Sequence, residues 1–197
     1  WLALPLGKLE QLNVQSDLET LRFAQTQQVR LTSIMEEIAS QQEQVTRLLQ
    51  ISGFGVVTAV TVWAAIGDIE RFGDAQHLVG YAGFGTRVHD SGMTSRSGRI
   101  TKAGRRDLRV VLIEAAQVAA NSHPHWKAEL ARLEPRLGRN KAIVAIARKL
   151  LVTVWYILAQ HKTDRFAEPE AIAQKFLKFA YQLGKENRPP GQTAAQF

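Results

Sequence analysis

The sequence contains no cysteine, and this absence excludes disulfide bonds and thiolate metal sites. Nothing in it therefore indicates a secreted, disulfide-stapled fold. A long hydrophobic run is also missing, since the most apolar stretch, residues 150–159, is too short to span a bilayer and follows Arg148 and Lys149. We accordingly expect a soluble, cytoplasmic protein with no membrane partner.

Acidic residues are fewer than basic ones. The 25 Lys and Arg outnumber the 18 Asp and Glu, and the resulting net charge of +7 favours a polyanionic partner, most often nucleic acid. The chain also lacks a Walker loop, a Rossmann fingerprint, an HExxH motif and a G-x-S-x-G motif, so the enzyme classes that these mark receive no support. The acids are scattered, and His123 and His125 have no third ligand close in sequence, so we predict no metal site in this chain.

Glycine and proline are absent from residues 8–52. Apolar residues recur there as on one face of a long helix, at Val14, Leu18, Leu21, Met35, Ile38, Val45 and Leu49. Polar side chains interrupt this seam, at Gln25, Gln28, Thr32 and Gln42. A polar seam favours a coiled coil with a chosen register, and the alternative is a helix that lies on a domain absent from this chain. We predict a coiled-coil stalk over residues 1–50 that joins the chain into a homodimer or tetramer.

Gly53 and Gly55 follow the stalk directly and precede an apolar helical stretch, residues 56–65. Glycine permits a positive φ and a close approach of the backbone. In helix-hairpin-helix modules, the amides of such a turn face a phosphate at the start of the second helix. The alternative is a plain turn between two helices.

Further helical patterns fill the rest of the chain. They cover residues 74–82, 105–120, 126–137, 139–161 and 170–183, with Asp74 as a capping residue, Gly138 as a stop and Pro169 as a first helical residue. We therefore predict an all-α fold in which residues 51–184 form one helical domain. Residues 185–197 contain Pro189, Pro190 and Gly191 and are expected to be a disordered tail.

The stretch from Gly83 to Gly104 is rich in glycine and hydroxyl groups and strongly basic, which predicts a loop, with a short hairpin around residues 88–99. Seven cations lie in or just after it, against only Asp90 and Asp107: Arg87, Arg96, Arg99, Lys102, Arg105, Arg106 and Arg109. We predict that these seven residues, together with Gly53 and Gly55, bind nucleic acid.

Ser91 is flanked by His89 and Asp90 on one side and by Gly92 on the other. A serine that attacks phosphorus needs exposure, positive charge to hold the phosphate, and a proton acceptor, and this loop offers all three. Composition does not rank Ser91 above its competitors, which are Thr94, Ser95 and Ser97. The alternative is a flexible phosphate-binding loop without a nucleophile.

Three motifs open a longer pattern: Ile51-x-Gly53-x-Gly55-x-x-Thr58-Ala59, Ile66-Gly67-Asp68-Ile69-x-x-Phe72 and Leu78-x-x-Tyr81-Ala82-Gly83. It continues through Ser91-Gly92, Gly98-x-Ile100-x-Lys102-x-Gly104 and Leu108-Arg109. In these motifs residues 48–115, about a third of the chain, resemble the C-terminal transposase domain of IS110/IS116/IS902-type elements, relatives of the Piv DNA invertases. One departure is Arg105, where the family more often has Asn.

The resemblance implies that Ser91 is the nucleophile and that DNA is cut and joined through a phosphoserine link, guided by an RNA. It also implies a separate N-terminal RuvC-like domain whose acidic residues hold Mg²⁺, while this chain alone binds no cofactor. Because the chain begins with Trp1 rather than Met, we expect it to be a piece of a longer protein, inactive without that domain and associated with the nucleoid.

Two other functions remain open at this point. One is a non-catalytic helix-hairpin-helix module that binds nucleic acid. The other is a coiled-coil scaffold whose positive charge only aids solubility. DNA cleavage that depends on Ser91 separates the recombinase from the module, and salt-sensitive DNA binding separates the module from the scaffold.

Overall fold

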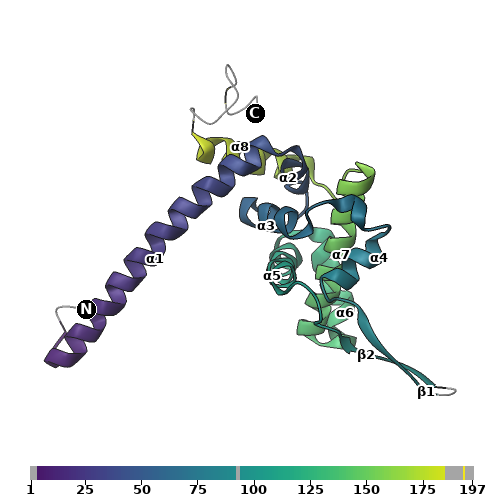
Figure 1. Ribbon diagram of the computed structural model, residues 1–197, viewed down its shortest axis with the longest axis horizontal. Helices are drawn as coiled ribbons and strands as arrows, with labels where there is room; N and C mark the ends of the chain where they lie inside the picture. The colour runs from purple at the N-terminus through teal and green to yellow at the C-terminus, as the bar shows by residue number, and fades with distance from the viewer. Residues whose placement is uncertain (1–3, 92–93, 185–192, 194–197) are drawn as a thin grey trace.

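A computed structural model describes residues 4–91, 94–184 and 193, and of residues 86–91 and 94–99 it describes the backbone only. One long helix, α1 (Lys8–Gln41), projects from a helical head as a stalk (Figure 1). A two-stranded hairpin projects from the head elsewhere. The fold class is therefore all-α with one small hairpin, as the sequence predicts.

The stalk helix runs without interruption because neither glycine nor proline breaks it, and at its first turn Glu10 accepts a hydrogen bond from the Gly7 amide at 2.7 Å. It stops at Gln42, whose backbone is extended, and a short helix, α2 (Glu43–Leu48), follows. The long helix predicted for the stalk, over residues 1–50, is thus broken at Gln42. The chain bends because Val45, Leu48 and Leu49 are buried in the core of the head, which a straight continuation of the stalk would not allow.

Seven elements complete the helical part of the described chain: α3 (Val56–Ile66), the 3₁₀ turn η1 (Ile69–Arg71), α4 (Ala75–Tyr81), α5 (Arg106–Ser122), α6 (Pro124–Leu137), α7 (Arg139–Gln160) and α8 (Pro169–Leu183). Local signals set several of their ends. Asp74 caps α4 by accepting from the amides of Gln76 and His77, and Pro124 and Pro169 open α6 and α8. α7 runs through the middle of the head and packs against α4, α5 and α6 (Figure 1).

By length and apolar composition α7 could cross a membrane, and it is the one described helix of which this is true. The apolar stretch noted in the sequence, residues 150–159, is only the second half of this helix, so the expectation that no segment is long enough to span a bilayer did not take in its full length. In the fold, however, Ile146, Leu150, Leu151 and Val154 of α7 are fully buried at 0% exposure. The apolar side chains of α7 thus pack in the core of the head.

The hairpin consists of β1 (Thr86–Ser91) and β2 (Thr94–Ile100), which pair antiparallel with an irregularity between Thr86 and Val88. Thr86 lies opposite Ile100 at the root, and Ser91 lies opposite Thr94 at the other end. The predicted short hairpin is confirmed, and it is a little longer than residues 88–99.

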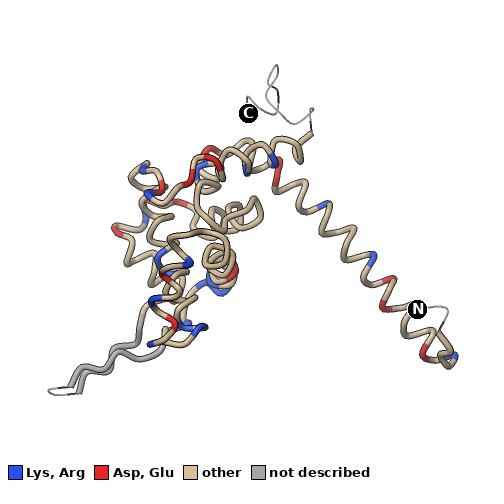
Figure 2. Tube along the Cα trace, turned by 180° about the vertical axis from the view of Figure 1, so that it is seen from behind, with Lys and Arg blue, Asp and Glu red and all other residues tan. Residues whose placement is uncertain are grey.

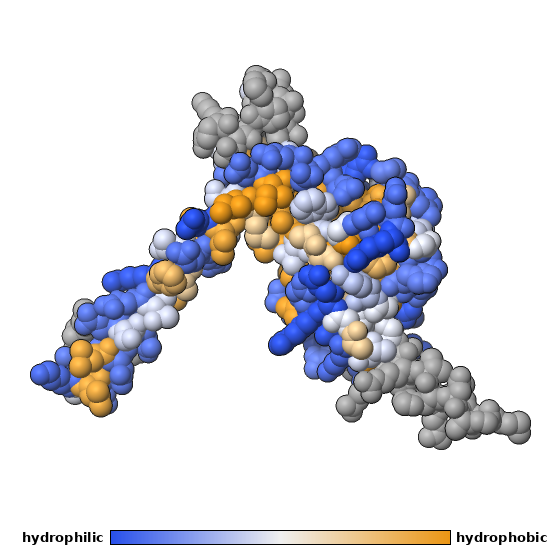
Figure 3. All heavy atoms as spheres, in the orientation of Figure 1, coloured by the Kyte–Doolittle hydropathy of each residue, from blue (hydrophilic) through white to orange (hydrophobic). Residues whose placement is uncertain are grey.

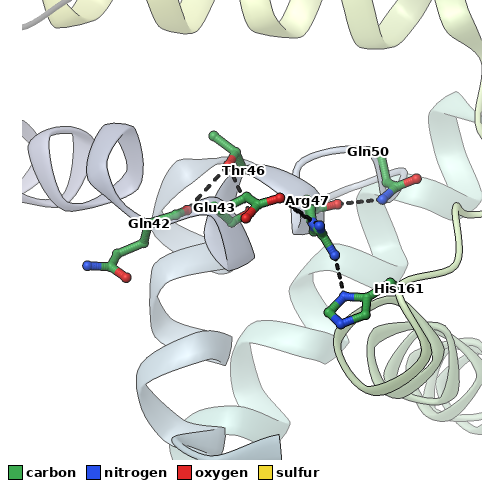
Figure 4. Close-up of polar contacts among 6 residues, drawn as sticks. All are labelled: Gln42, Glu43, Thr46, Arg47, Gln50 and His161. Atoms are coloured by element: carbon green, nitrogen blue, oxygen red, sulfur yellow. Dashed lines mark hydrogen bonds and ion pairs between the residues drawn. The ribbon is translucent and has the colours of Figure 1, made fainter. Parts of the chain in front are cut away.

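Polar contacts fix the base of the stalk to the C-terminal part of the head. Arg47 of α2 pairs with Glu43 and with His161, the residue that follows α7 (Figure 4). The Gln50 side chain donates to the Arg47 carbonyl. Gln50 also accepts a hydrogen bond from the Asp164 amide at 2.8 Å. The ammonium of Lys175 on α8 donates to the carbonyls of Leu49 and Ile51, at 2.6 and 2.9 Å. Residues 47–51 are therefore bound to residues far along the chain.

Candidate nucleic-acid interface

The hairpin carries the predicted nucleophile at its tip. Ser91 is the last residue of β1, and its partner Thr94 is the first residue of β2. Arg96 and Arg99 lie on β2, and Arg87 lies on β1. The side chains of these four hairpin residues lie outside what the structure describes, as does Gly92. The backbone alone thus puts Ser91 and the three arginines on one projecting ribbon.

Backbone contacts extend the hairpin ladder to its root in the head. The Thr101 amide donates to the Gly85 carbonyl at 2.8 Å, and the Lys102 amide donates to the Gly83 carbonyl at 3.2 Å. Gly104 lies so close to the end of α4 that a Cβ there would be 2.2 Å from the Tyr81 carbonyl oxygen and 2.5 Å from the Gly83 nitrogen. Only glycine allows this approach, so Gly104 anchors the ribbon in the head.

Arg109 holds the same root from the side of α5. Its Nη1 donates to the Ala82 carbonyl at 2.9 Å and to the Gly104 carbonyl at 3.4 Å, and the residue is half-buried. These bonds give Arg109 a role inside the protein, and its predicted contact with nucleic acid stays a prediction.

Arg105 is also engaged. Its Nε and Nη2 donate to the two carboxylate oxygens of Asp107, at 3.0 and 2.6 Å, and its Nη1 lies 3.5 Å from the Tyr81 hydroxyl. The hydrogen bonds from Arg105 lower the pKa of Asp107 to about 2, and the same pairing raises the pKa of Arg105. The Arg105 charge is thus paired within the chain, because Asp107 stays ionised at neutral pH.

Lys102 and Arg106 are exposed and make no ion pair within the described part of the chain. Lys102 has a positive φ of 55°, which is rare for a residue with a side chain and marks the turn between β2 and α5. Figure 2 shows Lys and Arg gathered where the hairpin leaves the head. Of the predicted cations whose side chains are described, Lys102 and Arg106 are the two most available to an outside phosphate.

The turn at Gly53 and Gly55 does not have the simple form of a phosphate loop. Gly53 has a φ of +81°, and a Cβ on it would lie 2.2 Å from the Ala115 carbonyl oxygen of α5. Close packing of the turn on α5 therefore explains Gly53 without a phosphate. Gly55 has open space around it and precedes α3, whose first amides receive no side-chain cap. Phosphate contact at Gly55 stays a prediction.

The two histidines at the start of α6 have structural contacts. His123 is buried, and its Nε2 donates to the Phe166 carbonyl at 2.8 Å. The His125 ring stacks on the Phe166 ring with centroids 3.5 Å apart. Nowhere in the described residues do three His, Cys, Asp or Glu side chains form a metal-binding group.

Sequence reasoning missed one group of residues that the fold brings together. His125 and Trp126 of α6, Tyr156 of α7, and Arg165 and Phe166 of the following loop surround one hollow. They lie up to forty-one positions apart in the sequence. No periodicity or short motif could have joined them, because α7 must fold back along α6 before they meet.

Residues 45–131 match the model of the Transposase IS116/IS110/IS902 family. The matched segment begins in α2, includes the hairpin with Ser91, and ends in α6, and through it the chain is similar to this transposase family. The resemblance seen in the sequence is therefore confirmed.

The named relatives include a transposase and two gene-inverting proteins. The chain is 33% identical over 136 residues to the transposase for insertion sequence element IS1111A of Coxiella burnetii, covering 66% of this chain and 37% of the relative. It is 34% identical over 119 residues to the pilin gene-inverting protein of Moraxella bovis, covering 58% and 37%. The corresponding protein of Moraxella lacunata is 33% identical over 119 residues, with the same coverage. The chain thus spans little more than a third of the length of these relatives.

Proposed function

We propose that this chain is the serine-bearing part of a DNA recombinase that carries out transposition or site-specific inversion. The observation that carries the proposal is the position of Ser91 at the free end of a projecting ribbon, within the segment that matches the transposase family. The names of the relatives, a transposase and two gene-inverting proteins, support the same class of reaction. The partner is DNA, and the expected location is the cytoplasm, at the nucleoid.

The proposed step is attack of the Ser91 hydroxyl oxygen on a DNA phosphorus. A bond forms between serine oxygen and phosphorus, the bond from phosphorus to one sugar oxygen breaks, and that oxygen leaves with a proton. The serine proton passes to a base, for which His89 and Asp90 are the nearest candidates in sequence. Cations of the hairpin and its root, Lys102 and Arg106 among them, stabilise the extra charge on the pentavalent phosphorus. A second transfer to a DNA hydroxyl releases the serine.

Other parts of the proposal lie outside this chain. We infer an N-terminal RuvC-like domain that holds Mg²⁺, an RNA that guides target choice, and a homodimer or tetramer formed through the stalk. The described residues contain no group of three metal-binding side chains, so we assign no step of this chain to the metal. The short coverage of the relatives supports further domains in the whole protein.

The test is Ser91→Ala in the full-length protein. We expect strand transfer to fall by orders of magnitude, and no DNA-linked peptide to be found by mass spectrometry, because no other hydroxyl occupies that atom position. DNA affinity should change little, since the cations remain. Ser95→Ala and Ser97→Ala are the matched controls and should keep the covalent adduct.

Two results would contradict this assignment. If Ser91→Ala still forms the adduct while Ser95→Ala or Ser97→Ala does not, the nucleophile is a different serine of the same hairpin. If none of the three changes affects the adduct, the recombinase proposal fails, and a non-catalytic nucleic-acid-binding module replaces it.

A further inference from the structure

A hollow of about 710 Å³ opens between α6, α7 and the loop that joins α7 to α8. Its volume is in the ordinary range for small-molecule sites, roughly 300–1,000 Å³. It shares no lining residue with the hairpin or its root, and its residues on α7 and the loop come after the segment that matches the transposase family. The hollow has no role in the reaction proposed for Ser91.

Aromatic rings form much of the wall. Phe166 stacks on His125 with an angle of 13° between the rings, and Trp126 meets the edge of Phe166 at 5.6 Å between centroids. Tyr156, on α7, is 40% exposed although it is a large aromatic residue on the central helix of the head. Trp126 itself is only 1% exposed, so the flat surface that the hollow offers comes from Tyr156 and from the partly exposed His125 and Phe166.

Cations stand beside these rings. The Lys162 ammonium lies 5.1 Å from the centre of the Tyr156 ring, and the Arg165 guanidinium lies 4.4 Å from the centre of the Phe166 ring. Within the part of the chain that the structure describes, neither cation has a carboxylate partner. Each aromatic ring thus has a positive charge next to it that can still take an anion.

The nearby acids do not cancel this charge. Glu129 is buried and pairs with Arg132 at 2.8 Å and with Lys149, and these hydrogen bonds lower its pKa to about 2. Asp164 is only 5% exposed, and burial raises its pKa. The rim of the hollow therefore presents Lys162 and Arg165 to solvent without a matching exposed carboxylate.

We propose that this hollow binds an unpaired nucleotide of a single-stranded nucleic acid. The base would lie against the aromatic wall at Tyr156, and its phosphate would pair with Lys162 and Arg165. Rings interleaved with cations are the usual way in which proteins hold single strands, because every base has a flat face and every nucleotide has a phosphate. A base within a duplex stacks on its neighbours and cannot offer that face.

The test measures binding of the chain to labelled oligonucleotides by fluorescence anisotropy, with oligothymidine, oligouridine and a DNA duplex, each about 12 nucleotides long. Tyr156→Leu should weaken binding of the single strands by roughly 5- to 100-fold, as expected for the loss of one stacked base. Duplex affinity should not change, since duplex contacts lie elsewhere. The two single strands show whether the natural source is DNA or RNA.

Tyr181→Leu is the matched control, because Tyr181 is an aromatic residue on α8 that is 67% exposed. It should leave all three affinities as they are. As a second variant, Lys162→Gln combined with Arg165→Gln should make the dependence of log affinity on log salt shallower by about 1.4 units for single strands.

The proposal is overturned if both variants bind single strands like the wild type, or if Tyr156→Leu weakens duplex and single strands equally. Far-ultraviolet circular dichroism of each variant shows whether the helices are intact before binding is compared. The readout is equilibrium binding, so its failure would say nothing against Ser91 as the nucleophile.

Discussion

Gly53 and Gly55, in the turn before α3, have different structural roles. Gly53 combines a φ of +81° with an approach to α5 that leaves no room for a Cβ, while Gly55 has a φ of −103° and nothing within 4 Å. The first is thus fixed by packing and the second is not. The two glycines of the Gly-x-Gly pattern look equivalent in the sequence, but only Gly53 is required by close packing on α5.

This difference predicts opposite outcomes for two alanine substitutions. Gly53→Ala should lower the free energy of unfolding by about 2–4 kcal/mol, because it adds left-handed backbone strain to a steric clash with the Ala115 carbonyl. Gly55→Ala should change it by less than about 1 kcal/mol. Urea unfolding of both variants measures this. Equal midpoints for the two would mean that the turn is free to move away from α5.

The element that ties the head together at the base of the stalk is α8, through Lys175. This side chain donates to the carbonyls of Leu49 and Ile51, and burial lowers its pKa to about 8 from the ordinary 10.5. Between pH 8 and 10.5 the unfolded chain therefore keeps a proton at this position that the folded chain has released. The contribution of Lys175 to the free energy of unfolding must rise with pH across this window.

We expect the free energy of unfolding of the wild type, relative to Lys175→Met, to rise by at most about 3 kcal/mol as the pH goes from 8 to 10.5. Chemical unfolding at several pH values measures the difference. Lys178→Met, one turn further along α8 at an exposed position, is the control and should follow the wild-type profile. A flat difference between the wild type and Lys175→Met would show that Lys175 does not titrate in this window.

Elements with local signals could be predicted, and those that depend on distant contacts could not. Asp74 caps a helix with its side chain, Gly138 ends one with a positive φ, and Pro169 begins one with its fixed φ, so these boundaries follow from the sequence. The break at Gln42 has no such signal, because its cause is the burial of Leu48 and Leu49 against helices that come later. In the same way, the sequence predicts a turn at Gly104, but it does not predict the close approach of Gly104 to Tyr81.

At the scale of the whole molecule, most of the stalk helix α1 is exposed, while its C-terminal end packs on α3 and α8. On the predicted seam Leu21 is 52% exposed, and off the seam Leu9, Phe23 and Val29 are 72%, 67% and 72% exposed. Figure 3 shows apolar side chains at intervals along it and a larger apolar patch where it meets the head. A helix of this length and exposure is seldom stable alone, so self-association through the predicted seam would supply the missing contacts.

We predict that Leu21→Glu weakens this self-association, because it puts a charge on the seam formed by Val14, Leu18 and Leu21. Analytical ultracentrifugation over a range of concentrations should show an oligomer for the wild type and a shift toward monomer for the variant. Thr20→Glu adds the same charge beside the seam and should leave the oligomer unchanged. A wild-type chain that stays monomeric at high micromolar concentration would rule out the coiled coil.

Because the helix breaks at a single residue, Gln42, a rotation there would move the whole of α1 relative to the head. The helix beyond it has 34 residues, hence a length of about 51 Å at 1.5 Å per residue. A rotation of about 10° at Gln42 would move the far end by roughly 9 Å, more than the pitch of one helical turn. The contacts of Arg47, Gln50 and Lys175 hold the chain after Gln42. The helix α1, whose buried residues Glu36 and Ala39 lie near its C-terminal end, packs on α3 and α8, so such a rotation has to move these contacts as well. In an oligomer formed through the stalk, as proposed above, a small rotation at the base would change the distance between the heads while each head keeps its own fold.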